Sequence, residues 1–372
     1  MKPTSVGTEQ VTGAAKWPAF EWVDDAPLPN TLRLPARGER MLVLNDVSEP
    51  TLKTREVADW LADPATRVAA GGSNVVFVTP RISQTVIIAA CDWSAVPTDA
   101  YTIDLTVEAG MGLDALVRAT ADRGWFGLEA LAEIPGKVGA APMQNVGAYG
   151  TEIADHTRWV EAWDRRERRV ERFARDACDF SYRHSRFKRE PGRWLILRVG
   201  LSLSTTPPAD WPPVAYPGVD EAVRDWSTHT SRARSTISPA QYAEMITTIR
   251  RAKLPDWRGG WPGSAGSFFH NPIVAAELAE RLSRRWPDMP RFDVSGGVKI
   301  PAGWLIEAAG LKGYREGPVA VSSRHALVLE HHGGASGGEF LRFAESVRDR
   351  VQDVTGIRLV VEPECVRETL HE

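Results

Sequence analysis

The hydrophobic pattern of this chain alternates between short apolar runs and longer stretches in which apolar residues keep helical spacing. Runs rich in β-branched and aromatic residues at 41–44, 75–78 and 85–90 predict strands. Between the first two runs, residues 51–61 are expected to form a helix. Strands that alternate with a helix over so short a distance indicate a small α/β domain.

A second folding unit is expected to begin near Tyr101. Its first strand is predicted at 103–108, and a helix follows over 112–123, where leucine, valine and alanine recur at helical spacing. Two further apolar runs, at 159–163 and 194–199, predict strands of the same unit.

Proline marks the loops of the C-terminal half. The proline-rich segments 205–215 and 254–262 predict loops, and the second predicts a domain boundary. Ser238, followed directly by proline, predicts the start of a helix. Beyond the boundary the pattern predicts helices at 274–285, 302–309 and 338–355, a strand at 326–330, and a last strand from 357 that delivers Glu364 at its end.

The composition indicates a globular protein without a basic surface field. The chain has 372 residues, of which 43% are hydrophobic and 25% are charged, so a large core is available. Its formal net charge is −3, which argues against a nucleic-acid or anionic-membrane partner. An anionic ligand must therefore be held by a local site.

The cysteines and the N-terminus indicate a soluble, cytoplasmic protein. Cys91, Cys178 and Cys365 are odd in number and far apart, which argues against a disulfide framework and a zinc ribbon. Residues 1–28 lack periodicity and an apolar signal core, so a mobile leader is expected there. No apolar run approaches the ~20 residues that span a bilayer.

The stretch from Glu133 to Glu152 is rich in glycine and alanine, and we interpret its small residues as a ligand-binding feature and not as core packing. Main-chain amides that are free of bulky side chains can approach a ligand closely and form an anion-binding concavity. A second small-residue segment, 69–74, turns into the strand predicted at 75–78. Together the two segments predict a clamp on one phosphate-bearing cofactor.

Three further motifs accompany these segments: Tyr-Arg-His-Ser-Arg-Phe-Lys at 182–188, Gly-Ser-Phe-Phe-His-Asn-Pro at 266–272 and Val-Glu-Pro-Glu at 361–364. In this order, from about Asn30 to Val366, the set resembles the UDP-N-acetylenolpyruvoylglucosamine reductase (MurB) family of bacterial flavoenzymes.

The resemblance implies an α/β (α+β) fold: an FAD-binding fold of the vanillyl-alcohol-oxidase/MurB type with a C-terminal α/β substrate domain. FAD-binding subdomain 1 is expected at 29–98, joined by the C-terminal strand 357–372. Subdomain 2 is expected at 99–253, and the substrate domain at 254–356.

The resemblance also implies the chemistry. The expected cofactors are noncovalently bound FAD and NADPH. The expected substrate is UDP-N-acetylglucosamine enolpyruvate, which the enzyme reduces. The protein is expected to be a monomer. Ser267 matches the family's general acid, and Arg183 and Glu364 match the residues that stabilise the enolate-like intermediate. Glu362 is the less favoured choice for the acidic position.

Binding positions carry over from the same motifs. The implied FAD-binding residues lie in the two glycine-rich segments and at one arginine: Gly71, Gly72, Ser73, Asn74, Pro135, Gly136, Gly139, Ala140, Gln144, Asn145, Gly147, Ala148, Tyr149, Gly150 and Arg250.

The implied substrate-binding residues are Tyr182, Tyr216, Lys253, Asn271 and His325. Tyr216 matches a tyrosine that, in one branch of the family, closes over the substrate pyrophosphate, and Lys253 matches a phosphate-binding lysine.

Two departures keep alternatives open. His270 stands where the family has lysine, and His325 stands where it has glutamine, so a reductase of a different sugar nucleotide remains an alternative. An FAD oxidase of the same fold is a second alternative, although neither glycine-rich segment contains a histidine or cysteine for covalent flavin attachment. The adjacent His331 and His332 lack a partner set for zinc, so no metal is expected.

Overall fold

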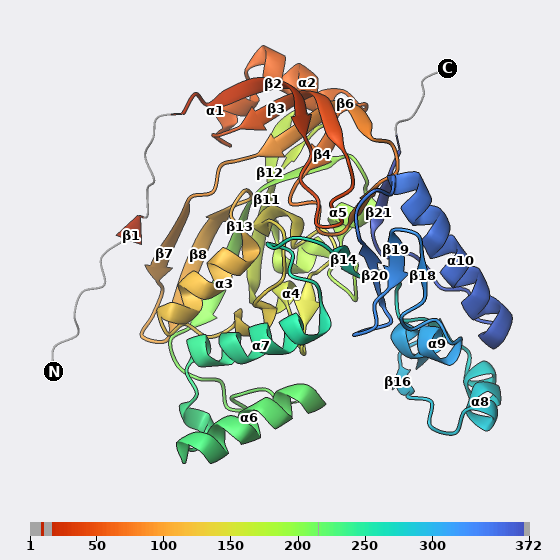
Figure 1. Cartoon of the computed structure of the whole chain (residues 1–372). Coiled ribbons are helices and arrows are strands. Elements are labelled where there is room, and N and C mark those ends of the chain that lie inside the picture. Colours follow the sequence, from red (N-terminus) through yellow and green to blue (C-terminus); the bar gives the residue numbers. More distant parts are fainter. Residues whose placement is uncertain (1–8, 11–16, 215, 368–372) are drawn as a thin grey trace. The chain divides into compact units, whose positions relative to one another are not determined.

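The computed structural model describes residues 9–10, 17–214 and 216–367. It divides into two compact units. Figure 1 shows the course of the chain and labels many of its helices and strands. Unit 1 comprises Met1–Ala26, Gly38–Gly71 and Ser83–Arg250, and unit 2 comprises Pro27–Arg37, Gly72–Ile82 and Arg251–Glu372. The C-terminal boundary lies near the one predicted at 253/254, whereas the division into three domains stays a prediction.

Unit 1 contains a six-stranded sheet whose neighbouring strands all run antiparallel. Helix α3, Leu113–Asp122, confirms the helix predicted at 112–123, and its leucine and valine side chains are buried in the main core of the unit. In sheet order the strands are β1 (Glu9–Gln10), β7 (Trp93–Pro97), β8 (Thr102–Glu108), β13 (Trp194–Ser204), β11 (Thr157–Asp164) and β12 (Arg169–Ala174).

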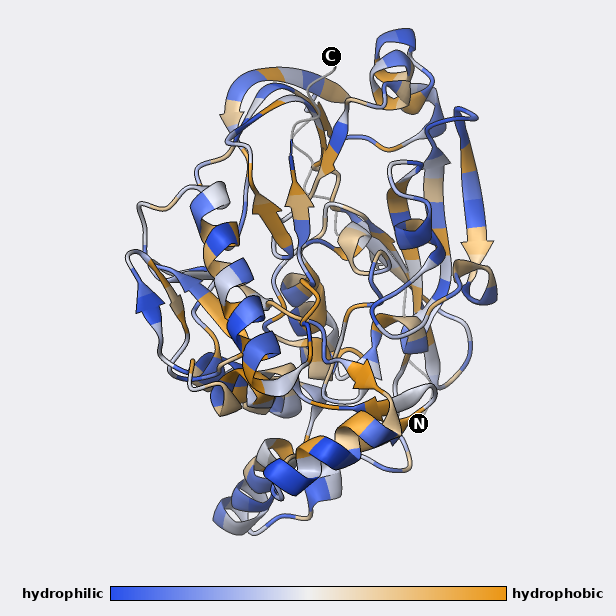
Figure 2. Cartoon of the chain, turned by 90° about the vertical axis from the view of Figure 1, so that its right-hand side faces the viewer, coloured by the Kyte–Doolittle hydropathy of each residue, from blue (hydrophilic) through white to orange (hydrophobic). Residues whose placement is uncertain are grey.

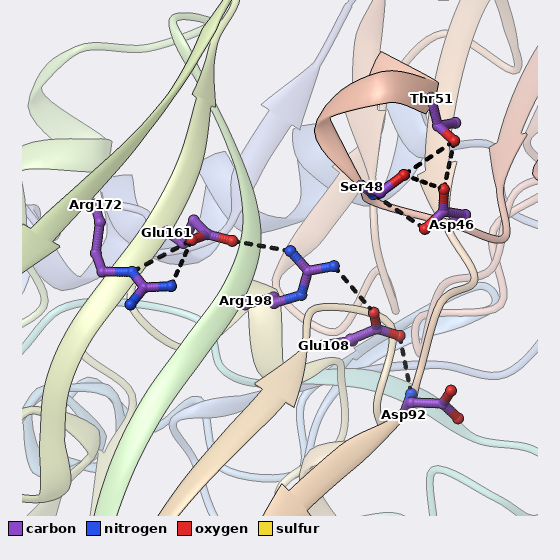
Figure 3. Close-up of polar contacts among 8 residues, drawn as sticks. All are labelled: Asp46, Ser48, Thr51, Asp92, Glu108, Glu161, Arg172 and Arg198. Carbon is purple, nitrogen blue, oxygen red and sulfur yellow. Dashed lines mark hydrogen bonds and ion pairs between the residues drawn. The ribbon is translucent and has the colours of Figure 1, made fainter. Parts of the chain in front are cut away.

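A ladder of alternating charges crosses four strands of this sheet (Figure 3). Glu161 lies opposite both Arg172 and Arg198, with N–O distances of 2.8 and 2.9 Å, and Arg198 lies opposite Glu108 at 3.4 Å. Burial acts to raise the pKa of Glu161, but the hydrogen bonds from both arginines outweigh it and lower that pKa. A one-residue slip of any strand would break the ladder, so these pairs help to specify the register.

A smaller four-stranded sheet is formed by residues on both sides of the second small-residue segment. Helices α1, Glu49–Leu52, and α2, Arg55–Ala62, replace the single helix predicted at 51–61, because Thr54, at φ −55° and ψ 130°, is not helical and interrupts the helix. The strand order is β2 (Phe20–Pro27), β3 (Arg37–Leu44), β6 (Arg81–Ile88) and β4 (Arg67–Ala69), with β4 parallel to β6.

The prediction of a mobile leader over 1–28 is wrong for Phe20–Pro27, which form β2 and pair with β3. Tryptophan packing explains the strand: the ring of Trp22 meets Trp60 edge-on at 4.8 Å between centroids, and the Arg40 guanidinium lies over Trp22. Residues 1–8 and 11–16 of the predicted leader lie outside the described residues.

The remaining elements of unit 1 include those that carry the glycine-rich stretch. Helix α6, Pro217–Thr230, was not predicted, whereas α7, Pro239–Lys253, begins where Ser238 predicted. The others are α4 (Ile153–His156), α5 (Arg186–Arg189), β9 (Gly147–Ala148), β10 (Thr151–Glu152) and the 3₁₀ helices η1 (Glu129–Leu131), η2 (Val138–Ala140), η3 (Arg175–Cys178) and η4 (Arg234–Thr236).

Among its described residues, unit 2 combines small sheets with three helices that lie wholly within it, and it has its own core. The described part of the chain contains no helix with the length and apolarity that crossing a bilayer requires. One sheet has the strand order β14 (Gly263–Ser267), β20 (Val328–His331), β19 (Val319–Val321) and β18 (Arg315–Glu316). A second has the order β15 (Ile273–Val274), β17 (Gly297–Lys299) and β16 (Phe292–Val294), and a third pairs β21 (Glu364–Val366) with β5 (Val75–Phe77). The helices are α8 (Ala276–Arg285), α9 (Ala302–Ala308) and α10 (Gly337–Thr355).

Helix α10 has clear start and stop signals. Ser336 and Glu339 form a reciprocal capping box at its N-terminus, and Gly356, at φ 75°, ends it in the left-handed conformation. Gly337 packs directly on the carbonyl of Phe77, so only glycine fits there. Figure 2 shows blue and orange residues interspersed along the helices, as expected for helices that cover a core on one side.

The strand predicted from residue 357 is wrong in its position. Residues 357–360 are not part of a strand, and Val361 makes an isolated antiparallel bridge with Phe269. Glu364 begins β21, which runs parallel to β5, and therefore does not end a strand. Pairing partners elsewhere in the chain decided this outcome, and the local apolar pattern does not contain them.

Candidate active site

The glycine-rich stretch 133–152 folds as a compact loop of unit 1 with several residues at positive φ, among them Glu133, Asn145 and Tyr149. Gly71 and Gly136 pack backbone against backbone: a Cβ on Gly71 would lie 2.8 Å from the Gly136 Cα. The two predicted clamp segments therefore touch within this unit.

Packing explains some of the small residues, which corrects the interpretation that a ligand accounts for all of them. A Cβ on Gly139 would lie 2.5 Å from the Ala109 Cβ, and a Cβ on Gly147 would lie 2.9 Å from the Thr151 carbonyl oxygen. By contrast, a Cβ on Gly150 would have 3.7 Å to its nearest neighbour, the ring of Tyr216. Gly139 and Gly147 are therefore required by the fold itself.

The buried side chain of Asn145 holds this loop together by hydrogen bonds. Its side chain is 1% exposed, and its Nδ2 donates to Glu152 Oε2 at 2.5 Å and to the Ser181 carbonyl at 3.3 Å. Its Oδ1 accepts from the Ala154 amide at 3.2 Å. Both amide hydrogens of Asn145 are thus used inside the protein, and its predicted contact with the cofactor stays a prediction.

Arg183 lies at the tip of a tight turn that is attached to the same loop. Ser181 and His184 exchange two backbone hydrogen bonds of 3.1 and 3.0 Å, which close the turn. Arg183 has φ 54°, and its Nη2 donates to the Gly147 carbonyl at 3.0 Å. Together with Asn145, this contact fastens the predicted catalytic arginine to the predicted cofactor loop.

Tyr149, Tyr216 and Arg250 form an aromatic and cationic cluster in unit 1. The rings of Tyr149 and Tyr216 meet edge-on at 5.6 Å, and Arg250 hydrogen-bonds the Tyr149 side chain. Burial lowers the pKa of Arg250 and raises that of Tyr149. The Nε of Arg250 is buried and has no hydrogen-bond partner among the described residues. A buried unpaired donor is costly, so this atom suits an acceptor supplied by a bound group.

Three predicted motifs are joined by backbone hydrogen bonds within unit 2. The Glu362 amide donates to the Phe268 carbonyl at 3.0 Å, and the His270 amide donates to the Val360 carbonyl at 2.9 Å. The Glu364 amide donates to the Asn74 carbonyl at 2.9 Å. The turn at 72–74, the segment of Ser267 and the Glu-Pro-Glu segment are thus held side by side.

Ser267 and Glu364 both have exposed side chains in this arrangement. Ser267 ends β14 opposite Val328, directly after Gly266, whose φ is 71°. Glu362, the less favoured acid, has a side chain that is 10% exposed and lies 3.7 Å from His270 Nδ1. The pairing with His270 gives Glu362 a role inside the unit, which leaves Glu364 as the better candidate for contact with a ligand.

The predicted substrate residues of unit 2 differ in their surroundings. Lys253 and His325 are neighbours: burial lowers the pKa of His325, and the positive charge of Lys253 lowers it further. The Oδ1 of Asn271 accepts from the Ala302 amide at 2.9 Å and so caps the N-terminus of α9. In the described ranges, no group of three or more His, Cys, Asp or Glu residues is arranged to hold a metal ion.

The structure therefore groups the predicted site residues by unit. The central role of Asn145 was not predicted from the sequence. Nor were the contacts of Ser185 and Lys188, two residues of the Tyr182–Lys188 motif, with the loop and the turn. Their presence in a recognised motif was the available signal. Unit 1 holds Tyr182, Arg183, Tyr216 and Arg250 with the glycine-rich loop, and unit 2 holds Ser267, Glu364, Lys253, Asn271, His325 and the turn 72–74.

Two family models match this chain. Residues 258–366 match the C-terminal domain of UDP-N-acetylenolpyruvoylglucosamine reductase, and residues 60–171 match an FAD binding domain. Of the three predicted catalytic residues, Ser267 and Glu364 lie in the segment 258–366, and Arg183 lies between the two matched segments.

Full-length relatives extend the match. The UDP-N-acetylenolpyruvoylglucosamine reductase of Alcanivorax borkumensis is 39% identical over 349 residues, which cover 92% of this chain and 96% of the relative. The enzyme of the same name from Azoarcus sp. is 40% identical over 347 residues, covering 91% and 95%. The crystal structure of MurB from Thermus caldophilus superposes with a TM-score of 0.60 at 22% identity, covering 94% of this chain and 99% of that one, and confirms the fold class. At this identity and coverage, the chain belongs to the UDP-N-acetylenolpyruvoylglucosamine reductase family.

Proposed function

We propose that this protein is an FAD-dependent oxidoreductase that uses NADPH to reduce UDP-N-acetylglucosamine enolpyruvate to UDP-N-acetylmuramate, for peptidoglycan precursor synthesis in the bacterial cytoplasm. The observation that carries the proposal is that direct backbone hydrogen bonds join the segment of Ser267 to the segment of Glu364. The chain that contains them is 39% identical, over 92% of its length, to a UDP-N-acetylenolpyruvoylglucosamine reductase. We further propose that it acts as a monomer.

The two glycine-rich segments and Arg250 have the chemistry needed to bind FAD noncovalently. The loop 133–152 presents small residues and main-chain amides, and Arg250 offers a buried Nε donor without a partner among the described residues. Neither glycine-rich segment contains a histidine or cysteine for covalent attachment. When bound, FAD supplies the hydride carrier between NADPH and the enol ether. The proposed binding residues are those of the segments 71–74 and 135–150, together with Arg250.

Ser267 is proposed as the general acid. Hydride addition to the methylene carbon of the substrate leaves the adjacent carbon in need of a proton, and the product forms when that proton arrives. The exposed hydroxyl of Ser267 at the end of β14 is free of the core and can face a ligand. Proton transfer by a positioned side chain typically accelerates such a step by about 10²–10⁴-fold.

Arg183, as a cation, and Glu364, as a hydrogen-bond donor when its carboxyl carries a proton, are proposed to stabilise the negative charge that develops toward the substrate carboxylate. Preorganised donors and cations lower the energy of such a charge most when their geometry is fixed beforehand. The closed turn and the contact of Arg183 with the Gly147 carbonyl provide this fixation for the guanidinium. The pairing of β21 with β5 provides it for the backbone of Glu364.

Five side chains are proposed to bind the sugar nucleotide. Lys253 supplies a positive charge for the diphosphate, and the exposed ring of Tyr216 supplies a hydroxyl donor. The helix cap uses the side-chain oxygen of Asn271, and its amide nitrogen is proposed to donate to the substrate. Tyr182 and His325 complete the proposed set.

An anaerobic two-step experiment tests this function. The purified protein is first reduced with NADPH and then mixed with UDP-N-acetylglucosamine enolpyruvate, and the absorbance of the FAD is followed. We expect the first step to bleach the flavin and the second to restore its colour with formation of UDP-N-acetylmuramate. UDP-N-acetylglucosamine, which lacks the enol ether, is the matched control. If the enol ether leaves the flavin reduced, the proposed substrate is wrong.

A further inference from the structure

The backbone of Arg183 is held in a conformation that arginine rarely adopts. Its φ of 54° lies in the left-handed region, where a side chain other than glycine is strained. The turn that contains it is closed by the two hydrogen bonds between Ser181 and His184. Such strain persists only where surrounding contacts fix the backbone, so the contacts at this turn decide where the guanidinium points.

Lys188 makes one of these contacts. Its Nζ donates to the Arg183 carbonyl oxygen at 3.0 Å, from the one-turn helix α5. A charged donor on a carbonyl forms a stronger hydrogen bond than a neutral one. This bond therefore fixes the peptide group that follows the strained residue.

Lys188 is itself held in place. Its backbone amide donates to the Ser185 Oγ at 3.3 Å, and the same hydroxyl donates to the Met143 carbonyl of the glycine-rich loop at 2.6 Å. Phe187, next to it, is buried at 1% exposure. Lys188 is thus linked to the cofactor loop through its backbone amide and Ser185, and its ammonium group contacts the turn that contains Arg183.

The neighbouring cations of α5 serve other contacts. Arg186 lies over the ring of Phe173, 5.0 Å from its centroid, and Arg189 pairs with Asp179 at 2.6 Å. The helix therefore offers a matched control, because Arg189 has the same charge on the same helix and pairs with Asp179, outside the turn 181–184.

We propose that Lys188 is a positioning residue for the reduction of the enol ether: it holds the backbone of Arg183 in the left-handed conformation and thereby aims the guanidinium. This inference rests on the proposed function of Arg183. It predicts that loss of the ammonium slows the substrate half-reaction through Arg183 and leaves the reduction of FAD by NADPH unchanged.

The kinetic test compares Lys188→Met, Lys188→Arg and the control Arg189→Ala in single-turnover half-reactions. We expect Lys188→Met to slow reoxidation by the enol ether by about 10- to 100-fold, the range for loss of a hydrogen bond from a charged donor. Lys188→Arg should restore much of the rate, and Arg189→Ala should match wild type. Equal slowing of both half-reactions in Lys188→Met would overturn the proposal.

A second arm separates positioning from a general structural effect. In an Arg183→Ala background, Lys188→Met should change the substrate half-reaction by no more than about 2-fold, because the side chain it aims is gone. A full additional loss in that background would overturn the proposal.

Hydrogen exchange gives a readout that does not depend on the substrate. The backbone amides of Ser181 and His184 should exchange faster in Lys188→Met than in wild type or Arg189→Ala, and unchanged exchange would overturn the positioning role. If wild type fails to reduce the enol ether, the proposed function is wrong, and this arm alone then decides whether Lys188 holds the turn.

Discussion

Glu129 should make the stability of unit 1 depend on pH. It begins the 3₁₀ helix η1 and is 3% exposed. Its Oε2 accepts from the Gly127 amide at 2.5 Å, whereas its Oε1 is buried and has no hydrogen-bond partner among the described residues. Burial raises the pKa of Glu129 from 4.5 to about 7, which exceeds the opposing effect of the backbone hydrogen bonds.

The magnitude follows from linkage between protonation and folding. Between pH 4.5 and about 7 the folded state holds a proton on Glu129 that the unfolded state has lost. The stabilisation that this proton provides is therefore fully present below pH 4.5 and is lost as the pH rises to about 7. At 1.36 kcal/mol per pKa unit, ionised Glu129 costs about 3 kcal/mol of unfolding free energy.

Replacing Glu129 by glutamine removes the titration. The unfolding free energies of Glu129→Gln and wild type are measured by urea titration at several pH values from 5 to 8. We expect the difference between variant and wild type to grow in favour of the variant by most of those ~3 kcal/mol as the pH rises. FAD occupancy must be the same in all samples, since a ligand of the folded state adds its own stability. The control is Glu221→Gln on the exposed surface of α6. Parallel pH profiles for wild type and Glu129→Gln would refute the assigned pKa.

Three further predictions concern the site and the sheet. Ser267→Ala should slow the substrate half-reaction by about 10²–10⁴-fold with flavin reduction by NADPH unchanged, and equal slowing of both would remove it from the role of acid. Tyr216→Phe keeps the ring contact with Tyr149 and loses the hydroxyl, so the KM for the sugar nucleotide should rise; an unchanged KM would remove that hydroxyl from the substrate site. Glu161→Gln leaves Arg172 and Arg198 without their shared carboxylate. The unfolding free energy should fall by about 1–2 kcal/mol, a value already reduced because Arg172 is exposed to solvent. An unchanged urea midpoint would mean that the ladder adds no stability.

Much of the local structure followed from the sequence pattern. The helix α3 and the start of α7 follow from apolar spacing and from Ser238 with its proline, which are short-range signals. The prediction failed where tertiary contacts decided the outcome. Phe20–Pro27 form a strand through pairing with β3 and through the packing of Trp22 on Trp60, neither of which has a local signature.

The sequence by itself determined the family and the residue types available for its chemistry, because motif identity and spacing are properties of the chain alone. It could not determine which glycines the fold requires: Gly139 must be glycine because Ala109, thirty residues earlier, lies against it. Nor could it reveal that Asn145 uses both amide hydrogens within the protein. Only the tertiary structure decided that Glu364 begins a strand beside Val75, since backbone pairing joins segments whose separation along the chain leaves no pattern in either one.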